Sequence, residues 1–229
     1  METIEFRNVS FAYPNCEKKA LDNITFSIET SEFVVICGKS GCGKSTLLRH
    51  LKKNLTPYGK GEGEILYYGQ DISEIDDRTS SSDIGFVQQN PDNQIVTDKV
   101  WHELAFGLEN LGLDNALIKR RVGEMASFFG IQTWFRKNVS ELSGGQKQLL
   151  NLASIMVMQP KLLILDEPTS QLDPIAASEL LKAVYKINRD LGTTVIISEH
   201  RLEEVFPMAD RVAVMEKGEI INFDRPRSV

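Results

Sequence analysis

A glycine-rich segment near residue 40 carries the side chains best suited to hold phosphate groups. Residues 38–46 read Gly-Lys-Ser-Gly-Cys-Gly-Lys-Ser-Thr, between an apolar run that predicts a buried strand and a stretch that predicts a helix. Glycines let the backbone approach phosphate oxygens, and successive N–H groups at a helix start form a cradle for anions. Lys44 would add a positive charge at the β- and γ-phosphates, and Ser45 a hydroxyl ligand for Mg²⁺. The segment therefore predicts a site for Mg²⁺ and a nucleoside triphosphate.

By itself this loop indicates a P-loop NTPase and does not choose among kinases, GTPases and ATPases. Cys42 lies inside the loop at the predicted helix start, where we expect a reactive thiol. The residues expected to contact the nucleotide in this segment are Gly38, Lys39, Ser40, Gly41, Cys42, Gly43, Lys44, Ser45 and Thr46.

Two carboxylates follow an apolar run later in the chain. Residues 162–165 are Leu-Leu-Ile-Leu, and Asp166 and Glu167 come directly after them. A parallel sheet places ligands at the carboxyl ends of its strands, so these acids are expected to face the phosphate loop. Asp166 would then hold Mg²⁺ through water, and Glu167 would orient or deprotonate an attacking water. The alternative is an exposed turn at the strand end, since Pro168 follows.

A second helix start suited to an anion lies at residues 142–146, Leu-Ser-Gly-Gly-Gln. Ser143 can cap the helix, and the glycines leave its first amides open. This segment resembles the LSGGQ motif of the ABC ATPase family, which closes over ATP held by the opposite subunit. The resemblance implies that Ser143, Gly144, Gly145 and Gln146 contact that ATP.

Other residues occur in the family's order and cover nearly the whole chain. Tyr13 stands where the family places an aromatic ring against adenine, although an ordinary strand tyrosine is the alternative. Gln89 resembles the Q-loop glutamine, which binds Mg²⁺ and couples to the transporter; Gln88 is the alternative register. Residues 170–173 resemble the D-loop, and His200 the switch histidine that contacts the γ-phosphate. The catalytic set implied by the resemblance is Lys44, Gln89, Glu167 and His200, with Ser45, Gln89 and Asp166 at the metal.

One segment departs from the common family pattern. The family often has Thr-His-Asp at the switch, whereas residues 198–204 read Ser-Glu-His-Arg-Leu-Glu-Glu. This variant, together with residues 90–96, resembles ATPases of energy-coupling-factor importers, which import vitamins and metal ions. Some members of that group are fused in tandem or carry a C-terminal extension. We therefore expect the sequence to be one half of a fused pair or a shortened chain.

The elements that must position these residues follow from hydrophobic periodicity. Strands are expected at 4–11, 23–28, 32–37, 64–68, 162–165 and 194–198, with a hairpin at 210–215 and 219–223. Helices are expected at 44–54, 97–111, 115–129, 145–158 and 175–190. The prediction is an α/β fold: one ABC ATPase domain with a RecA-like P-loop NTPase core (1–88 and 159–229), an antiparallel β portion, and an inserted α-helical subdomain at about 89–158.

Composition argues against a nucleic-acid partner and against a membrane span. The 229 residues carry a formal net charge of −6, whereas nucleic-acid binders usually show a basic face. No apolar run approaches the roughly 18–20 residues of a membrane helix, and residues 1–6 lack the features of a signal peptide. Three cysteines, Cys16, Cys37 and Cys42, fit a reducing compartment. We expect a peripheral protein at the cytoplasmic face of the membrane, bound to transmembrane transporter subunits.

The expected function is ATP hydrolysis at a head-to-tail dimer interface, with itself or a related ATPase domain, to drive import of a small solute. A DNA-repair or ribosomal ABC ATPase is the first alternative. The former inserts long coiled coils between the Q-loop and LSGGQ, where this chain has about fifty residues, and the latter carries two domains with a charged linker. A nucleotide-locked regulatory module is the second; it would lack the base or the switch residue, but Glu167 and His200 are both present.

Overall fold

The computed structural model describes residues 1–16 and 18–227, and this part of the chain contains ten strands and seven α-helices. The strands are β1 (Glu2–Ala12), β2 (Leu21–Glu29), β3 (Phe33–Cys37), β4 (Lys60–Tyr67), β5 (Gln70–Asp71), β6 (Ile84–Val87), β7 (Leu162–Asp166), β8 (Thr194–Ser198), β9 (Arg211–Glu216) and β10 (Glu219–Asp224). The helices are α1 (Lys44–His50), α2 (Asp77–Asp83), α3 (Val100–Asn110), α4 (Asn115–Phe128), α5 (Gly144–Met156), α6 (Pro174–Leu191) and α7 (Leu202–Val205).

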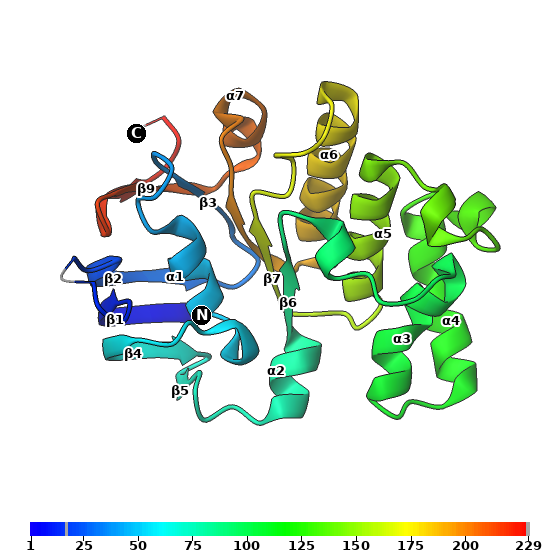
Figure 1. Cartoon of the computed structure of the whole chain (residues 1–229), viewed down its shortest axis with the longest axis horizontal. Helices are drawn as coiled ribbons and strands as arrows, with labels where there is room; N and C mark the ends of the chain where they lie inside the picture. Colours follow the sequence, from blue (N-terminus) through cyan, green and yellow to red (C-terminus); the bar gives the residue numbers. More distant parts are fainter. Residues whose placement is uncertain (17, 228–229) are drawn as a thin grey trace.

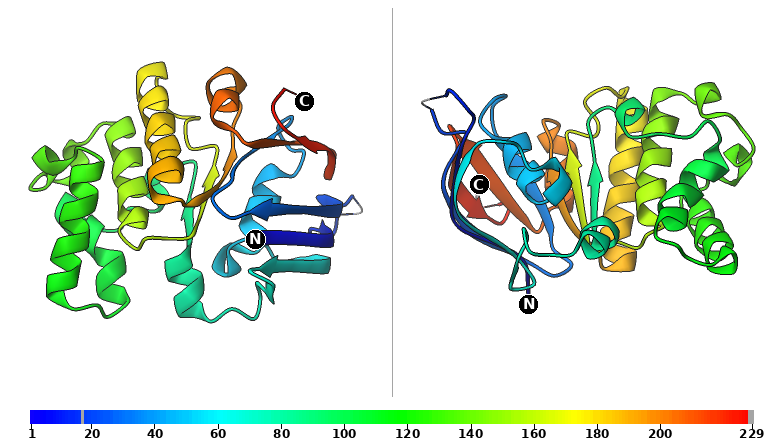
Figure 2. Two further views of the ribbon diagram at one scale, coloured as in Figure 1. Left: turned by 180° about the vertical axis from the view of Figure 1, so that it is seen from behind. Right: turned by 60° about the horizontal axis from the view of Figure 1, so that its bottom comes forward.

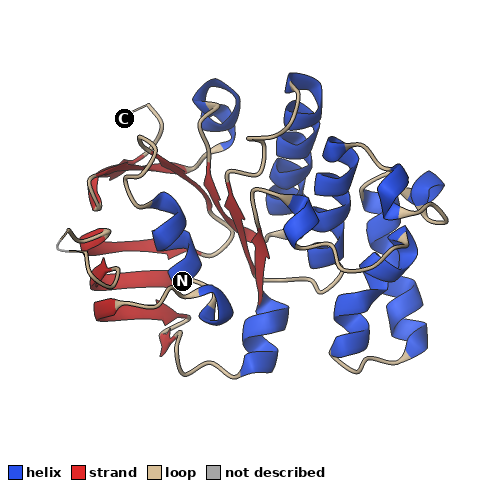
Figure 3. Cartoon of the chain, in the orientation of Figure 1, coloured by secondary structure: helices blue, strands red, loops and turns tan. Residues whose placement is uncertain are grey.

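The strands form two sheets. The smaller sheet is antiparallel and has the order β2-β1-β4-β5. The larger sheet has the order β10-β9-β3-β8-β7-β6; it is parallel from β9 to β6, with β10 antiparallel at one edge. Figures 1 and 3 show the antiparallel strands at one end of the molecule and most of the helices at the other. The expected α/β fold with an antiparallel β portion is confirmed.

The central strands are buried on both faces because their side chains alternate between two cores. In β3, Phe33 and Val35 pack into one core, while Val34 and Ile36 pack into the other. The first core is completed by α3, α4, α5 and α6, and the second by α1 and the antiparallel sheet. The right view of Figure 2 shows this layered arrangement from below, with α3, α4, α5 and α6 on one side of the parallel strands and α1 with the antiparallel sheet on the other. Such two-sided burial explains the unbroken apolar runs in these strands.

Helices α3, α4 and α5 come between β6 and β7 in the sequence and lie together at the end of the molecule away from the antiparallel sheet (Figure 1). This is the stretch for which the sequence predicts an inserted helical subdomain. None of the described helices is both long and apolar enough to cross a membrane.

The sequence does not predict four of these elements: α2, β5, β6 and α7. Strand β6 is only four residues long and contains Gly85, so its pattern is too short and interrupted to read. The glycine has a packing role, because an added Cβ would lie 2.5 Å from Cγ2 of Ile155 in α5. A side chain at residue 85 would therefore push α5 away from the sheet.

The expected helix at 44–54 is too long, since α1 ends at His50. Lys52 has an extended backbone, and its ammonium donates to the carbonyl oxygens of Ser80 and Ile84 at 2.5 Å each. These bonds draw the chain out of the helix and tie it to α2 and β6. Burial lowers the pKa of the Lys52 amine to about 8.

Arg211 joins the two sheets at the start of β9. Its guanidinium forms a two-pronged ion pair with Glu32 and donates from Nη2 to the Ser27 carbonyl oxygen in β2 at 2.9 Å. The hydrogen bond to Glu32 raises the pKa of Arg211 further. The side chains of Arg211 and Glu32 are 27% and 11% exposed, so this ion pair is partly shielded from solvent.

We expect Arg211→Met to lower the free energy of unfolding by about 1–3 kcal/mol, because the partly buried Glu32 carboxylate would lose its cationic partner and keep only the Glu29 N–H. Urea denaturation of the two proteins would measure this difference. Arg7→Met is the matched control, since the Arg7–Glu5 pair is more exposed, at 50% and 27%, and should change stability by less than about 0.5 kcal/mol. Equal effects at the two sites would contradict the assigned role of Arg211.

Candidate active site

The phosphate loop is held in its turn by two glycines. Gly38 and Gly43 have φ angles of 149° and 114°. A Cβ on Gly38 would lie 2.2 Å from the Met215 carbonyl oxygen, and one on Gly43 would lie 2.5 Å from the Ala20 carbonyl oxygen. Both positions therefore require glycine, for space as well as for backbone angle.

Lys44, the first residue of α1, extends back across this loop. Its side chain is 3% exposed, and its Nζ donates to the Gly38 carbonyl oxygen at 3.1 Å. Farther along α1, the Thr46 hydroxyl lies 3.0 Å from the Tyr13 hydroxyl. Tyr13 therefore lies beside the start of α1, next to the loop.

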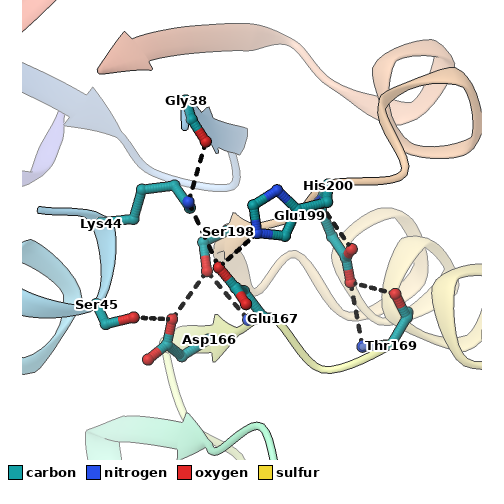
Figure 4. Close-up of polar contacts among 9 residues, drawn as sticks. All are labelled: Gly38, Lys44, Ser45, Asp166, Glu167, Thr169, Ser198, Glu199 and His200. Atoms are coloured by element: carbon teal, nitrogen blue, oxygen red, sulfur yellow. Dashed lines mark hydrogen bonds and ion pairs between the residues drawn. The ribbon is translucent and has the colours of Figure 1, made fainter. Parts of the chain in front are cut away.

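Asp166 closes β7 directly behind the loop. Its Oδ1 accepts hydrogen bonds from the Ser45 hydroxyl at 2.9 Å and from the Ser198 hydroxyl at 3.0 Å (Figure 4). The structure thus brings Ser45 and Asp166 together, although 121 residues separate them. Their oxygens are the hard ligands that Mg²⁺ prefers, so this pair fits the predicted metal role.

Glu167 has a left-handed backbone, with a φ angle of 47°. Its N–H donates to the carbonyl oxygen and the hydroxyl of Ser198, at 3.1 and 3.0 Å, which fixes this turn. The carboxylate Oε1 lies 3.4 Å from Lys44 Nζ and 2.8 Å from His200 Nε2 (Figure 4). A strained residue held by several bonds is a mark of functional sites.

Of these side chains, Lys44, Ser45 and Glu167 border a cleft of about 630 Å³ that follows the phosphate loop, whereas Asp166 and His200 do not line it. Gln89 lines it together with Lys44, Ser45 and Glu167. Gln88 instead takes part in backbone bonds to neighbouring segments, at its N–H and its carbonyl oxygen. The geometry thus favours Gln89 over Gln88 as the glutamine that faces the ligand. The residues lining the cleft are Tyr13, Cys16, Lys18, Lys19, Ala20, Ser40, Gly41, Cys42, Gly43, Lys44, Ser45, Thr46, Gln89, Glu167, Lys217 and Gly218.

Some predicted contact residues do not line this cleft. The Gly38 carbonyl is turned to Lys44, and Lys39 is an exposed residue of the loop. Cys42 borders the cleft but is only 7% exposed and packs in the core beneath it. Burial therefore argues against the ready access to thiol reagents that the sequence suggests for Cys42. Burial also raises the pKa of the Cys37 thiol.

The LSGGQ segment is built as a capped helix start. Ser143 Oγ accepts from the Gln146 N–H at 3.3 Å, and Gln146 Oε1 accepts from the Ser143 N–H at 3.0 Å. Gly145 lies against α6, since an added Cβ would be 2.6 Å from Cβ of Ala176, whereas Gly144 faces open space. Ser143, Gly145 and Gln146 border a small separate cavity of about 150 Å³. The two predicted anion sites of the chain therefore do not share a cavity.

A family model described as "ABC transporter" matches residues 21–170, which include the phosphate loop, LSGGQ and Glu167. The chain belongs to the ABC transporter family. It is an ATP-binding cassette, the ATPase domain of that family. A curated relative, a putative ABC transporter ATP-binding protein of Bacillus anthracis, is 50% identical over 225 residues. That match covers 98% of this chain and 41% of the relative, so the chain spans about two fifths of the relative's length.

Solved structures of ABC cassettes share the whole fold. CbiO1 from Clostridium perfringens, part of the ABC transporter complex cbiONQ, is 33% identical, with a TM-score of 0.90 over 99% of this chain and 90% of that one. The cassette MJ1267 in its ADP conformation is 25% identical, with a TM-score of 0.83 over 98% of this chain and 91% of that one. The P-loop NTPase fold expected from the sequence is confirmed.

Two polar residues of this ABC cassette were not predicted as site residues. Ser198 bonds to both Asp166 and Glu167, and Glu199 is a buried carboxylate next to His200. Both stand at the end of β8, which pairs with β7 so that Ser198 faces Asp166. Their place at the carboxyl end of a parallel strand, beside the acidic pair, was the available signal.

Proposed function

We propose that this ABC cassette binds ATP with Mg²⁺ and hydrolyses it at an interface between two cassettes, and that this drives import of a vitamin, a metal ion or a similar small solute through membrane partners. The observation that carries the proposal is the Glu167 carboxylate, placed between Lys44 and His200 at the edge of the phosphate-loop cleft. A general base, a phosphate-binding cation and a switch residue thereby meet at one oxygen.

The phosphate loop would bind the triphosphate, with Lys44 supplying positive charge and Tyr13 beside the adenine ring of ATP. Ser45 Oγ, the Gln89 amide oxygen and, through water, Asp166 would hold Mg²⁺, which neutralises phosphate charge. The side chains present fit this ion, because Ser45 and Asp166 oxygens are 2.9 Å apart and Gln89 lines the same cleft.

Glu167 would orient the attacking water and accept its proton. In the structure its Oε1 contacts Lys44 Nζ at 3.4 Å and His200 Nε2 at 2.8 Å. A γ-phosphate carries more negative charge than one carboxylate, so it competes with Glu167 for the Lys44 ammonium and for the His200 ring. Its arrival would free Glu167 Oε1 for water, while His200 turns to the phosphate. The base would thus become available when substrate is present.

The second half of the site would come from another cassette. Ser143, Gly145 and Gln146 lie around a different cavity from Lys44, and the exposed start of α5 leaves Gly144 open to an incoming phosphate. A head-to-tail pairing with a second copy or a related cassette would bring each LSGGQ to the other chain's phosphate loop. The pairing would complete both sites.

We propose membrane transporter subunits as the partners, attached at the cytoplasmic face, and no nucleic-acid partner. Similarity to CbiO1, part of the ABC transporter complex cbiONQ, supports the importer class. The switch segment at 198–204 supports an energy-coupling-factor type.

The function is tested first through nucleotide binding. Lys44→Ala should raise the Kd for MgATP by about 10- to 100-fold, because a charged hydrogen bond to phosphate contributes roughly 1.5–3 kcal/mol. Isothermal titration calorimetry would measure the two affinities. Lys39→Ala is the matched control from the same loop. The Lys39 side chain is exposed and lies off the cleft, and alanine keeps the backbone N–H. Equal losses at Lys39 and Lys44 would contradict the assigned role of Lys44.

A further inference from the structure

Glu199 is a buried carboxylate whose role the mechanism above leaves open. The residue is 2% exposed, and among the described residues no lysine, arginine or histidine forms an ion pair with it. Its Oε1 accepts from the Thr169 N–H at 3.2 Å and from the Thr169 hydroxyl at 2.7 Å. Its Oε2 accepts from the His200 N–H at 3.2 Å (Figure 4). Burying a carboxylate costs free energy unless its oxygens are hydrogen-bonded, and these three donors satisfy both oxygens of Glu199.

The bonds of Glu199 tie two functional segments together. Thr169 is two residues past Glu167 and begins the turn to the 170–173 segment, where the Leu172 N–H donates to the Thr169 carbonyl oxygen. On the other side, His200 contacts Glu167 and Arg201 Nη2 donates to the Leu172 carbonyl oxygen at 3.0 Å. Of the three residues that make these hydrogen bonds between the segments, Glu199 is buried, whereas His200 is half exposed and Arg201 is partly exposed.

We propose that Glu199 is a positioning residue, which fixes the Thr169 and His200 peptide groups at a set separation and so aims the His200 ring at the Glu167 carboxylate. It touches neither nucleotide nor water itself. Its two oxygens accept bonds from opposite sides of the gap between the segments, and a carboxylate suits this place because every neighbour that bonds to it is a donor.

The side-chain chemistry predicts how substitutions rank. Alanine removes all three bonds. Glutamine keeps the shape, but its NH₂ group must then face either the Thr169 donors or the His200 N–H. Thr169→Val removes the hydroxyl donor and leaves the amide bond, so it is the mildest change.

The direct test observes the His200 ring by NMR in protein to which no nucleotide is added. The chain has three histidines, so protein carrying ¹⁵N-labelled histidine gives three sets of ring signals, assigned with His200→Ala. We expect the His200 Nε2 signal of Glu199→Ala to move toward its position in Glu167→Ala, although Glu167 is still present. The signals of His50 and His102 should stay in place. Glu203→Ala, an exposed carboxylate nearby, is the matched control and should move none of them.

The kinetic readout rests on the proposed function. Glu199→Ala should lower kcat by about 10- to 100-fold, the cost of misplacing a catalytic group by about 1 Å, and leave the Kd for MgATP within about twofold. Thr169→Val should fall between the wild type and Glu199→Ala. If the wild type itself does not hydrolyse ATP, the proposed function fails while the ring signals still decide the role of Glu199.

Two results would overturn this role. One is a His200 signal that is the same in Glu199→Ala and the wild type. The other is a shift of all three histidines with a parallel loss of ATP affinity, which would show that Glu199 only supports the fold. If Glu199→Ala does not fold, Thr169→Val and Glu199→Gln are judged by the same criteria.

Discussion

Glu167→Gln should bind MgATP as the wild type does and hydrolyse it about 100- to 1000-fold more slowly, the usual contribution of a general base. Glutamine has almost the same shape, so the left-handed turn at residue 167 and its bonds to Ser198 can persist. The amide cannot accept a proton from water. Loss of the charge beside Lys44 also leaves that lysine free for phosphate, so affinity should hold or rise.

Phosphate release and nucleotide binding, measured on the same preparation, would separate the two effects. Glu216→Gln, which removes an exposed carboxylate at the end of β9, is the control and should leave turnover unchanged. Near-normal turnover by Glu167→Gln would remove Glu167 from the mechanism. Loss of binding together with turnover would point instead to a collapsed loop.

The parts of the site that the sequence predicts are those set by local pattern. The phosphate loop needs glycine where its backbone nearly touches Met215 and Ala20, and it needs lysine and serine at the helix start. Because these residues lie within one short segment, the sequence alone identifies them. Asp166 and Glu167 follow an apolar strand, and strand ends meet at one edge of a parallel sheet. The α/β fold follows from the same alternation of buried strands and helices.

The features that escape prediction depend on contacts between distant segments. The bond between Glu199 and Thr169 joins segments 30 residues apart, and neither residue type marks such a place by itself. Strand β6 is recognisable only beside β7, which it joins in register. Cys42 is buried in a core formed by residues of the antiparallel sheet, β3, β9 and α1, several of them distant in sequence, so the sequence of the loop alone suggests an accessible thiol.

Lys44→Ala and Ser143→Arg, each inactive by itself, should recover activity when mixed. The two residues border separate cavities of one chain, and the proposed pairing places Lys44 of each chain against Ser143 of the other. A mixed dimer then has one site with both lesions and one with neither. Random pairing makes about half of the dimers mixed, each with one good site of two, so the ceiling is about a quarter of wild-type activity.

The expected result is recovery above zero and below that ceiling, measured as phosphate release from the mixture. If each site were built within one chain, every chain would be broken and mixing would restore nothing. Ser143→Arg also removes the helix cap, which contributes about 1 kcal/mol, so its fold must be checked by thermal unfolding. Each variant mixed with wild type, and size measurement of Glu167→Gln with ATP, show whether dimers form under the same conditions.

Absence of recovery despite dimer formation would have two explanations: each site is built within one chain, or turnover needs both shared sites intact. Two linked dimers separate them. A tandem dimer with both lesions in one half keeps Lys44 and Ser143 intact only in the other half, so each shared site carries one lesion. Shared sites with independent turnover predict no activity from this arrangement, because each site then contains one lesion: the intact phosphate loop faces the altered Ser143, and the altered loop faces the intact one. The tandem with one lesion in each half has one fully intact shared site and should be active. Activity in the first tandem and none in the second would place each site within a single chain and reject the proposed pairing.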